Sequence, residues 1–469
     1  MRYEDCLAEA RAAHERYRAL PAPAPRRRDA VYSAAAQSRL LSDWLSSESS
    51  ADEEIAPRTR LLRARARDLE RNNGAIRNYL HLLAVNVVGP HGVRLQSRVR
   101  NNDGRPARLV NQRIEDAWLD WASSPMLSGV HDLVTFQQIL LRTVARDGEV
   151  FVRKWIGFDG NKYSFALEAI EADLVDETFD MRASTGRNEV RLGIEVDQFG
   201  RRVAYHAWNR AASDLTGRPR ERLRIPASEV IHLYRPVRAN ETRGVTWMAS
   251  VMVPARMLEG YFEAELVAAR IGAAKMGFFT RTAAEGMGLP TGADTKQGAL
   301  NMDVSPGSLH QLPDGYDFQP FSADHPSTAF GPFVKDSNRR VAMGLNVSYN
   351  ALASDLENVN YSSMRSGMPI ERDTWQGLQH WWIQAFLRPV FAEWLNAALL
   401  SGALVLGPRD FRKFLADTWK PRGWPWVDPS KDVDAASKAV AEGLGTRTDT
   451  LAEQGKDIEE VFEKLAEEQ

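Results

Sequence analysis

The chain has 469 residues, with 60 Lys and Arg against 62 Asp and Glu, so its formal net charge is −2. That length is too great for one hydrophobic core and indicates about two to four domains, while 43% apolar and 26% charged residues exclude a wholly disordered chain and a collagen-like fibre. The single Cys excludes an internal disulfide and a thiolate metal cage, and the near-neutral charge lacks the basic excess usual in proteins that bind DNA or anionic lipid tightly.

The first 30 residues are predicted to form a short helix over 1–20 and then a Pro-rich, basic linker, PAPAPRRR. We interpret the linker as a solvated, mobile arm, with contact to a partner or nucleic acid as the alternative. The N-terminus lacks the apolar core of a secretory signal, and the apolar stretch at 394–406 is too short to span a bilayer. We therefore expect a soluble protein that is intracellular when made.

Residues 52–88 have the apolar periodicity of a long helix. Six of its arginines are crowded into residues 58–71: Arg58, Arg60, Arg63, Arg65, Arg67 and Arg71. Four acidic residues lie close to them in the sequence, so we interpret the arginines as a solvated or intersubunit salt-bridged face. Phosphate binding is the alternative.

The next part of the chain changes from helical to strand periodicity. Helices are predicted over 111–122 and 131–146, and the strands that follow are expected at 149–156, 163–170, 190–196, 203–208 and 225–234. The Asp197–Gly200 turn is a good hairpin signal. The first half is therefore predicted to be an α+β domain.

The second half is mainly helical. Thr246–Lys275 predicts a helix of about 45 Å, kinked at Pro254 and suited to packing against copies of itself. A Gly- and Pro-rich excursion, a helix over 329–345 and a polar Asn- and Ser-rich loop over 346–363 follow.

A long helix is then predicted from Met368 to Leu400, and seven of the 13 Trp lie between Trp375 and Trp426, where we expect burial and interfaces. Three short charged helices are expected from Asp428 onward, with caps at Asp428 and at Thr446 or Thr448.

Recognisable catalytic chemistry is absent from the sequence. There is no phosphate-cradling G-x-x-x-x-G-K-[ST] loop, no G-x-S-x-G elbow and no His pair at metal-ligand spacing. Acidic residues at 168–177 offer a divalent-metal site as a minority alternative to solvated strand ends. We predict no catalytic residue, no metal and no cofactor, and hence no enzyme.

The order of elements and several sequence blocks resemble the lambda-type phage portal proteins, which are head-tail connectors. The first block is RARARDLERNNGAIRNYLHLLAVNVVGPHGVRLQS. Others are LEAIEADLVDE, GIEVDQFGRRVAYH, IPASEVIHLYRPVRANETRGVTWMASVM, NVSYNALASDLENVNYSSMRSG and WPWVDPSKDVDAASKAVAEGLGTRTD. The likeness extends over roughly residues 30–469, nearly the whole chain.

The resemblance implies an α+β portal fold whose parts are named wing, stem, clip, tunnel loop and crown. It places the N-terminal arm at 1–30, the wing at 31–245 with a return helix at 361–405, the stem helices at 246–276 and 325–345, the clip at 277–324, the tunnel loop at 346–360 and the crown at 406–469.

The resemblance also implies a function. Such proteins form a ring of about twelve subunits at one capsid vertex, through which double-stranded DNA is packaged and later ejected. The implied partners are other copies of the chain, this DNA, the terminase large subunit, the major capsid protein and a head-completion or adaptor protein, without a membrane. The implied location is the virion, and the host cytoplasm during assembly.

Candidate site residues follow from this placement. In the tunnel loop, we expect short, replaceable hydrogen bonds to passing DNA from Asn350, Ser354, Asn358 and Asn360. In the second stem helix, Lys335, Arg339 and Arg340 are predicted to form a limited positive belt, or alternatively to pair with Glu259 or Glu263 of a neighbouring subunit. In the clip, the predicted docking residues are Asp303, Asp314 and Tyr316.

Two alternatives remain open. One is a ring-forming capsid or baseplate protein that conducts no DNA, and the other is a metal-dependent enzyme of nucleic-acid metabolism. The chain also stops soon after the short crown helices, where family members often continue, so we expect an abbreviated crown or a processed product.

Overall fold

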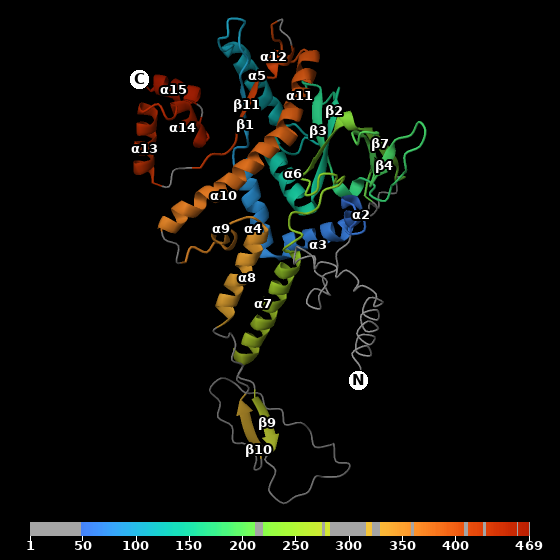
Figure 1. The fold of residues 1–469 in the computed structure, drawn as a ribbon, viewed down its shortest axis with the longest axis vertical. Helices are drawn as coiled ribbons and strands as arrows, with labels where there is room; N and C mark the ends of the chain where they lie inside the picture. Colours follow the sequence, from blue (N-terminus) through green and yellow to red (C-terminus); the bar gives the residue numbers. More distant parts are fainter. Residues whose placement is uncertain are drawn as a thin grey trace, which may run out of the picture. The chain divides into compact units, whose positions relative to one another are not determined.

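The computed structural model describes residues 48–211, 219–273, 277–281, 316–320, 329–357, 361–407, 411–424, 428–456 and 458–468. Helices and strands are mixed along this part of the chain, which confirms the α+β class (Figure 1). The predicted N-terminal helix and linker lie outside the described residues. No helix within the described ranges is both long enough and apolar enough to cross a bilayer.

The predicted helix over 52–88 is broken into four pieces. They are α2 (Ala51–Ile55), α3 (Thr59–Asn72), α4 (Gly74–Leu83) and the π-helix η3 (Ala84–Val88). Asn73 separates α3 from α4 because its backbone is extended (φ −117°, ψ 119°), and its side chain accepts the N–H of Ile76 as an N-cap. The apolar periodicity alone did not reveal this cap.

Two small sheets form the strand part. The first has the order β3-β2-β8, with β2 (Glu149–Ile156) between β3 (Phe165–Ile170) and β8 (Val230–Tyr234). The second is the antiparallel meander β4 (Glu189–Arg191), β5 (Ile194–Val196), β6 (Arg202–Trp208) and β7 (Arg222–Pro226).

Two predicted strands are each divided in two. The run 190–196 turns at Leu192 and Gly193, both at positive φ. The run 225–234 is interrupted by the 3-10 turn η5 (Ala227–Glu229), which sends β7 and β8 into different sheets. A further 3-10 turn, η4 (Ala172–Leu174), follows β3.

The helices α5 (Arg108–Ala122) and α6 (Leu133–Asp147) confirm the two helices predicted before the strands. The C-terminal helices α10 (Tyr361–Trp382), η6 (Ile383–Leu387) and α11 (Arg388–Leu400) run on without a break and start earlier than predicted. β1 (Arg94–Ser97) pairs antiparallel with β11 (Asp417–Lys420), and α12 (Phe411–Phe414) precedes β11.

Aromatic side chains join these elements in one core. The Trp118 ring lies 5.1 Å from Trp394, 5.7 Å from Phe391 and 5.7 Å from Trp419, centroid to centroid. The expected burial of the Trp-rich region is therefore confirmed for Trp375, Trp382, Trp394 and Trp419.

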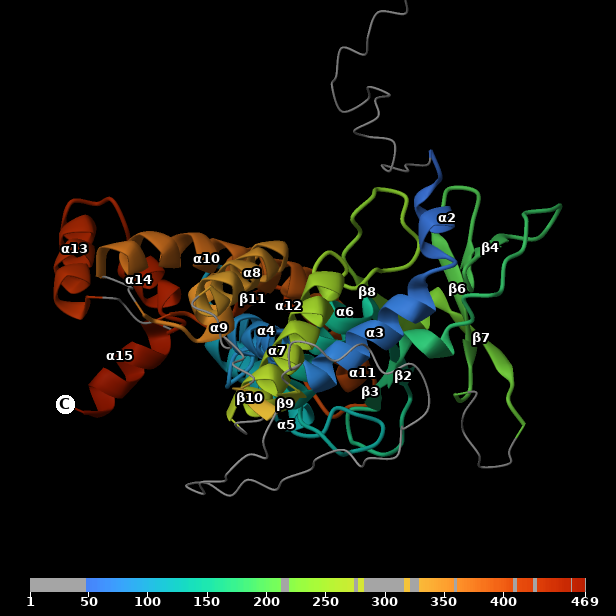
Figure 2. The ribbon, with the colours of Figure 1, turned by 90° about the horizontal axis from the view of Figure 1, so that it is seen from below.

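Helices α7 (Met252–Ala273) and α8 (Phe330–Gly344) lie side by side, as Figures 1 and 2 both show, and the Tyr261 ring packs 5.2 Å from that of Phe333. The predicted kink is wrong, because α7 begins at Met252 and Pro254 therefore occupies its first turn. Strands β9 (Gly277–Arg281) and β10 (Tyr316–Pro320) form an antiparallel pair. Asp303, Asp314 and the side chain of Tyr316 lie outside the description.

The region predicted as a polar loop contains a short helix, α9 (Tyr349–Ala353). The three predicted tail helices are confirmed as α13 (Pro429–Ala441), α14 (Arg447–Glu453) and α15 (Ile458–Glu467). Asp428 and Thr446 cap the first two by accepting the N–H of Lys431 and of Asp449.

Candidate functional site

The α8–α9 segment carries the predicted basic belt, and its charges are paired within the chain. Lys335 Nζ lies 2.6 Å from Glu357 Oε2 and 3.1 Å from Asp355 Oδ2. Both acids follow α9 directly in the sequence. The structure thus brings together a lysine that was predicted to face DNA and two carboxylates from the predicted polar loop.

Asp355 is held ionised by three hydrogen-bond donors. The Tyr349 hydroxyl donates to its Oδ2 at 2.7 Å, and the Glu357 N–H donates to its Oδ1 at 2.9 Å. The Tyr349 hydrogen bond, followed by the Glu357 N–H and Lys335, lowers the pKa of Asp355 to about 2. The carboxylate therefore stays charged at neutral pH and keeps Lys335 paired.

The two arginines of the belt differ. Arg339 Nη1 lies 2.8 Å from Asp336 Oδ1, one turn earlier in α8, and its guanidinium carbon lies 5.5 Å from the centroid of the Tyr349 ring. Arg340 is exposed and forms no ion pair with the described residues. Residues 330–357 contain three basic and three acidic residues, so this surface is neutral overall.

The predicted hydrogen-bonding residues fall partly on this segment. Asn350 is half-buried in α9, and exposed Ser354 ends α9 in a left-handed conformation (φ 52°). Asn358 and Asn360 lie outside the described residues.

Helix α9 itself is fixed in place. Leu352 is buried, and Asn78 Nδ2 donates to the carbonyls of Ala351 and Leu352 at 3.0 and 2.8 Å. The segment is therefore anchored to α4.

Glu259, a predicted intersubunit partner of the belt, is engaged elsewhere. Its Oε1 accepts a hydrogen bond of 2.9 Å from Asn73 Nδ2, at the break between α3 and α4. Glu263 is exposed on α7. Asn73 therefore both caps α4 and joins the first helices to α7.

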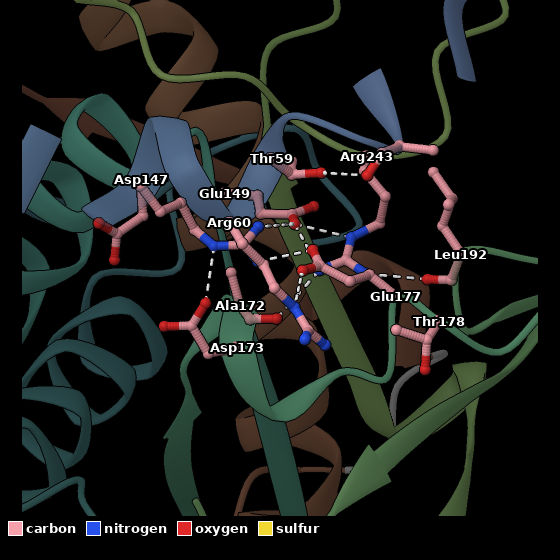
Figure 3. A network of polar contacts seen from close by, with 12 residues as sticks. Thr59, Arg60, Asp147, Glu149, Ala172, Asp173, Glu177, Thr178, Leu192 and Arg243 are labelled. Atoms are coloured by element: carbon pink, nitrogen blue, oxygen red, sulfur yellow. Dashed lines mark hydrogen bonds and ion pairs between the residues drawn. The ribbon is translucent and has the colours of Figure 1, made fainter. Parts of the chain in front are cut away.

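Three arginines of α3, Arg60, Arg63 and Arg67, form ion pairs within the chain (Figure 3). Arg63 is buried; its Nε donates to Asp173 Oδ1 at 2.8 Å and its Nη2 to Glu177 Oε2 at 2.6 Å. Arg60 adds a second bond to Glu177, and Arg67 bonds Asp173. The predicted solvated face is wrong for Arg63 and Arg67, because carboxylates from another part of the sequence fold against α3, whereas Arg60 forms its ion pair with a side chain that is 67% exposed.

The same pairing accounts for the acidic run at 168–177. Asp173 and Glu177 bind α3, while Asp176 lies 3.0 Å from Arg222 Nη1. Within the described ranges, no group of three or more His, Cys, Asp or Glu is arranged to hold a metal ion. The metal-site alternative therefore lacks a geometric basis there.

A second buried network centres on Glu149 at the start of β2. Arg243 Nε donates to Glu149 Oε1 at 2.7 Å, and its other nitrogens bond the carbonyls of Leu192 and Ala172 (Figure 3). Burial opposes the charge on Glu149, but Arg243, His232 and the N–H of Gly244 together outweigh it, and the pKa of Glu149 falls to about 2. No sequence spacing signals this pair.

His232 completes this network as a structural residue. Its Nε2 lies 2.8 Å from Glu149 Oε2, and its ring stacks between Phe151 and Tyr234 at 4.2 and 4.4 Å. Burial lowers the pKa of His232 to about 4, so the neutral ring donates its Nε2–H to the carboxylate.

The α7–α8 pair leaves large apolar side chains uncovered. Within α7 these include Val253, Met257 and Leu266, each more than 60% exposed. Phe333 and Met343 of α8 are exposed as well. Apolar surface gathered on neighbouring helices in this way usually marks an interface.

Comparison with known proteins indicates the family of this chain. A family model described as phage portal protein, lambda family, matches residues 37–379. A probable portal protein of Halomonas phage phiHAP-1 is 36% identical over 445 residues, covering 93% of this chain and 86% of the relative. Portal protein B of Escherichia phage lambda is 23% identical over 470 residues, covering 90% of this chain and 86% of its own length. A chain in the neck of an empty GTA particle is 16% identical, with a TM-score of 0.45, over 85% of this chain and 93% of that chain.

Proposed function

This chain belongs to the lambda family of phage portal proteins, a structural family and not one of enzymes, and on that premise we propose that it forms the portal ring of a tailed-phage head. The ring of twelve subunits sits at one capsid vertex and is the channel through which double-stranded DNA is packaged and ejected. The observation that carries the proposal is the family match over residues 37–379, together with the 36% identical portal relative.

The division into parts belongs to the same proposal. The wing comprises 31–245 with the return helix at 361–405, the stem 246–276 and 325–345, the clip 277–324, the tunnel loop 346–360 and the crown 406–469. The clip, with Asp303, Asp314 and Tyr316, docks the terminase large subunit and later a head-completion or adaptor protein. The wing meets the major capsid protein, and assembly takes place in the host cytoplasm before the protein becomes part of the virion.

Two features of the described residues support this function. The exposed apolar side chains of α7 and α8 supply a surface that further copies of the chain would cover on assembly into a ring. The α8–α9 surface, with Asn350, Ser354 and Arg340, which has no ion pair among the described residues, is neutral overall. Since each neutralised phosphate adds affinity, a neutral surface lets DNA slide without gripping it.

Assembly and conduction are tested separately. Mass photometry and electron-microscopy class averages of the purified chain are expected to show a closed ring. Monomers or dimers under every condition would contradict the proposal.

Conduction is tested with Asn350→Asp/Ser354→Asp, which places two negative charges on the surface proposed to face DNA without removing buried Leu352. We expect rings of normal symmetry and reduced packaging of DNA into heads. Normal packaging by this variant would favour a ring-forming capsid or baseplate protein that conducts no DNA.

A further inference from the structure

A cavity of about 270 Å³ lies where α4, the end of α8 and α10 meet the loop that follows β8 (Figure 1). Most of its lining is apolar or aromatic, including Tyr79, Leu83, Trp247, Leu345, Trp375 and Leu378. Apart from half-buried Trp247, these side chains are buried. The described residues that line the cavity include no acid. Concave, apolar sites with a few polar groups are typical of ligand binding, and this cavity has that composition.

Tyr79 of α4 supplies a hydrogen-bond donor that lacks an acceptor. Tyr79 is only 4% exposed, yet its hydroxyl makes no hydrogen bond with any described residue and is not sealed off from solvent. Burial raises the pKa of this hydroxyl against a smaller opposing effect of the Arg235 charge, so the proton stays in place at neutral pH. Buried tyrosine hydroxyls usually have a partner, so this one is available to an acceptor that enters the cavity.

Arg235 places a positive charge at the mouth of the cavity. Its side chain is exposed, and its guanidinium carbon lies 5.5 Å from the centroid of the Trp247 ring. It forms no ion pair within the part of the chain that the structure describes. Stacking on the indole holds the guanidinium beside the cavity, and a guanidinium can bind a carboxylate through two parallel hydrogen bonds.

Contacts within the chain shape the cavity before any ligand binds. Glu241 Oε2 accepts the N–H of Val237 at 2.6 Å and so fixes the loop that carries Arg235. At the end of α8, Gly344 packs so closely on Val251 that a Cβ at this position would clash with Val251 Cγ1. A cavity that is formed in advance loses little entropy when a ligand binds.

We propose that this cavity binds a carboxylate carried on an apolar body of about the size of one aromatic ring. The apolar body fills the space beside Leu83, Trp375 and Leu378. The carboxylate accepts hydrogen bonds from Tyr79 and Arg235. The volume lies just below the roughly 300–1,000 Å³ of pockets that hold drug-sized ligands, which limits the body to a small one. A phosphate suits the cavity less, because burying its larger charge against apolar walls costs more than a single cation offsets.

Two sources share this chemistry, a free small acid and an apolar residue at the carboxyl end of a protein chain. The test therefore includes a probe for each. The inference does not depend on the proposed function, because it concerns a cavity within one subunit.

Ligand-observed NMR titrations of the purified full-length protein provide the test. The first probe is 3-phenylpropionate, with the neutral 3-phenylpropionamide as its control. We expect saturable binding of the acid below about 10 mM and binding of the amide that is at least about tenfold weaker. The second probe is glycyl-glycyl-phenylalanine with a free carboxyl end. Tighter binding of this peptide than of 3-phenylpropionate supports a protein chain end as the ligand, and the reverse order supports a free acid.

Substitutions locate the binding. Tyr79→Phe and Arg235→Gln are each expected to weaken 3-phenylpropionate binding about tenfold, whereas Arg182→Gln, at an exposed position beside β4, leaves it unchanged. Because the Tyr79 hydroxyl has no hydrogen bond to lose, Tyr79→Phe is also expected to keep the melting temperature of the parent protein. Tyr163→Phe is the contrast, since it removes a hydroxyl that donates to Asp120 Oδ2 at 2.8 Å. That variant should melt earlier and bind the probe normally.

Three results would overturn the proposal: no saturable binding of either acid, equal binding of the acid and its amide, or full affinity in both Tyr79→Phe and Arg235→Gln. If Tyr79→Phe does not fold, Arg235→Gln gives the comparison from an exposed position.

Discussion

Arg63 of α3 donates its Nη2–H to Glu177 Oε2 across 2.6 Å, although 114 residues separate the two in the chain. Arg63 is 1% exposed and Glu177 is 8% exposed. Together with Asp173, this pair fastens the first helices to the strand part of the fold.

Replacing Arg63 tests how much this ion pair contributes to the free energy of unfolding. We expect Arg63→Met to lower the free energy of unfolding by about 3–5 kcal/mol, because it leaves buried carboxylate charge without its main partner. Arg65→Met, on the exposed side of the same helix, is expected to change it by no more than about 0.5 kcal/mol. Urea denaturation of both variants measures the difference. Equal effects would mean that the ion pair adds nothing beyond helix propensity.

The π-helix η3 presents Asn86 to the segment that follows β11. Asn86 Oδ1 accepts hydrogen bonds from Arg422 Nη1 and from Trp424 Nε1, at 2.7 and 3.2 Å. We expect Asn86→Ala to lower the free energy of unfolding by about 1–3 kcal/mol, because two donors lose their acceptor. Hydrogen–deuterium exchange should quicken at residues 417–424. Asn338→Ala in α8 is the matched control, and unchanged exchange in Asn86→Ala would show that this anchor is dispensable.

The depressed pKa of His232 predicts a pH dependence of stability. Between its ordinary value of 6.5 and its folded value of about 4, the unfolded chain binds a proton that the folded chain excludes. The stabilisation is therefore complete above pH 6.5 and is lost as the pH falls toward 4, up to about 3 kcal/mol. Glu149 has a folded pKa of about 2, so it lowers the stability of the fold further only below pH 4.5, its ordinary pKa.

Thermal melts from pH 7.5 to 5 check this dependence. His232→Gln keeps an N–H donor for Glu149 and removes the titrating group, so its melting temperature should fall less with acid than that of the parent. Parallel curves for the two proteins would exclude His232 as the source.

The neutral charge of the α8–α9 surface is also open to test. Asp355→Asn/Glu357→Gln removes both carboxylate partners of Lys335 and raises the charge of the segment by two. We expect rings to form normally and DNA packaging to slow several-fold, because each freed cation adds phosphate affinity. The measure is DNase-protected DNA per head. Asp116→Asn/Asp159→Asn makes the same charge change at exposed positions elsewhere, and an equal effect there would show that net charge alone matters.

Local patterns predicted much of the secondary structure. Helices α5 and α6, and the Asp428 and Thr446 caps of the tail, follow from apolar periodicity and from residues that satisfy helix ends locally. The failures occur where a local cap or turn, or a contact with a distant part of the chain, interrupts a longer pattern. Asn73 divides one predicted helix, η5 divides one predicted strand, and α9 forms inside a predicted loop because Leu352 is buried and Asn78 bonds its backbone.

The candidate site was predictable only in part. The blocks that resemble portal proteins indicated the family and directed attention to Lys335, Arg339 and Arg340. They did not indicate that Asp355 and Glu357 neutralise Lys335, because 20 and 22 residues separate these acids from the lysine and α9 must form before they meet it.

By itself, the sequence determined the family, the α+β class and most helices, since those depend on residue order and on spacings of a few residues. Only the tertiary structure decided which partners each charged side chain meets. Arg63, Arg67 and Arg243 have the same chemistry as Arg340, yet the first three face carboxylates that lie far away in the sequence, whereas Arg340 is exposed and forms no ion pair with the described residues. Interactions between exposed charges are largely screened beyond about 10 Å at physiological salt, so the fold, which determines which residues become neighbours, sets the sign of each surface.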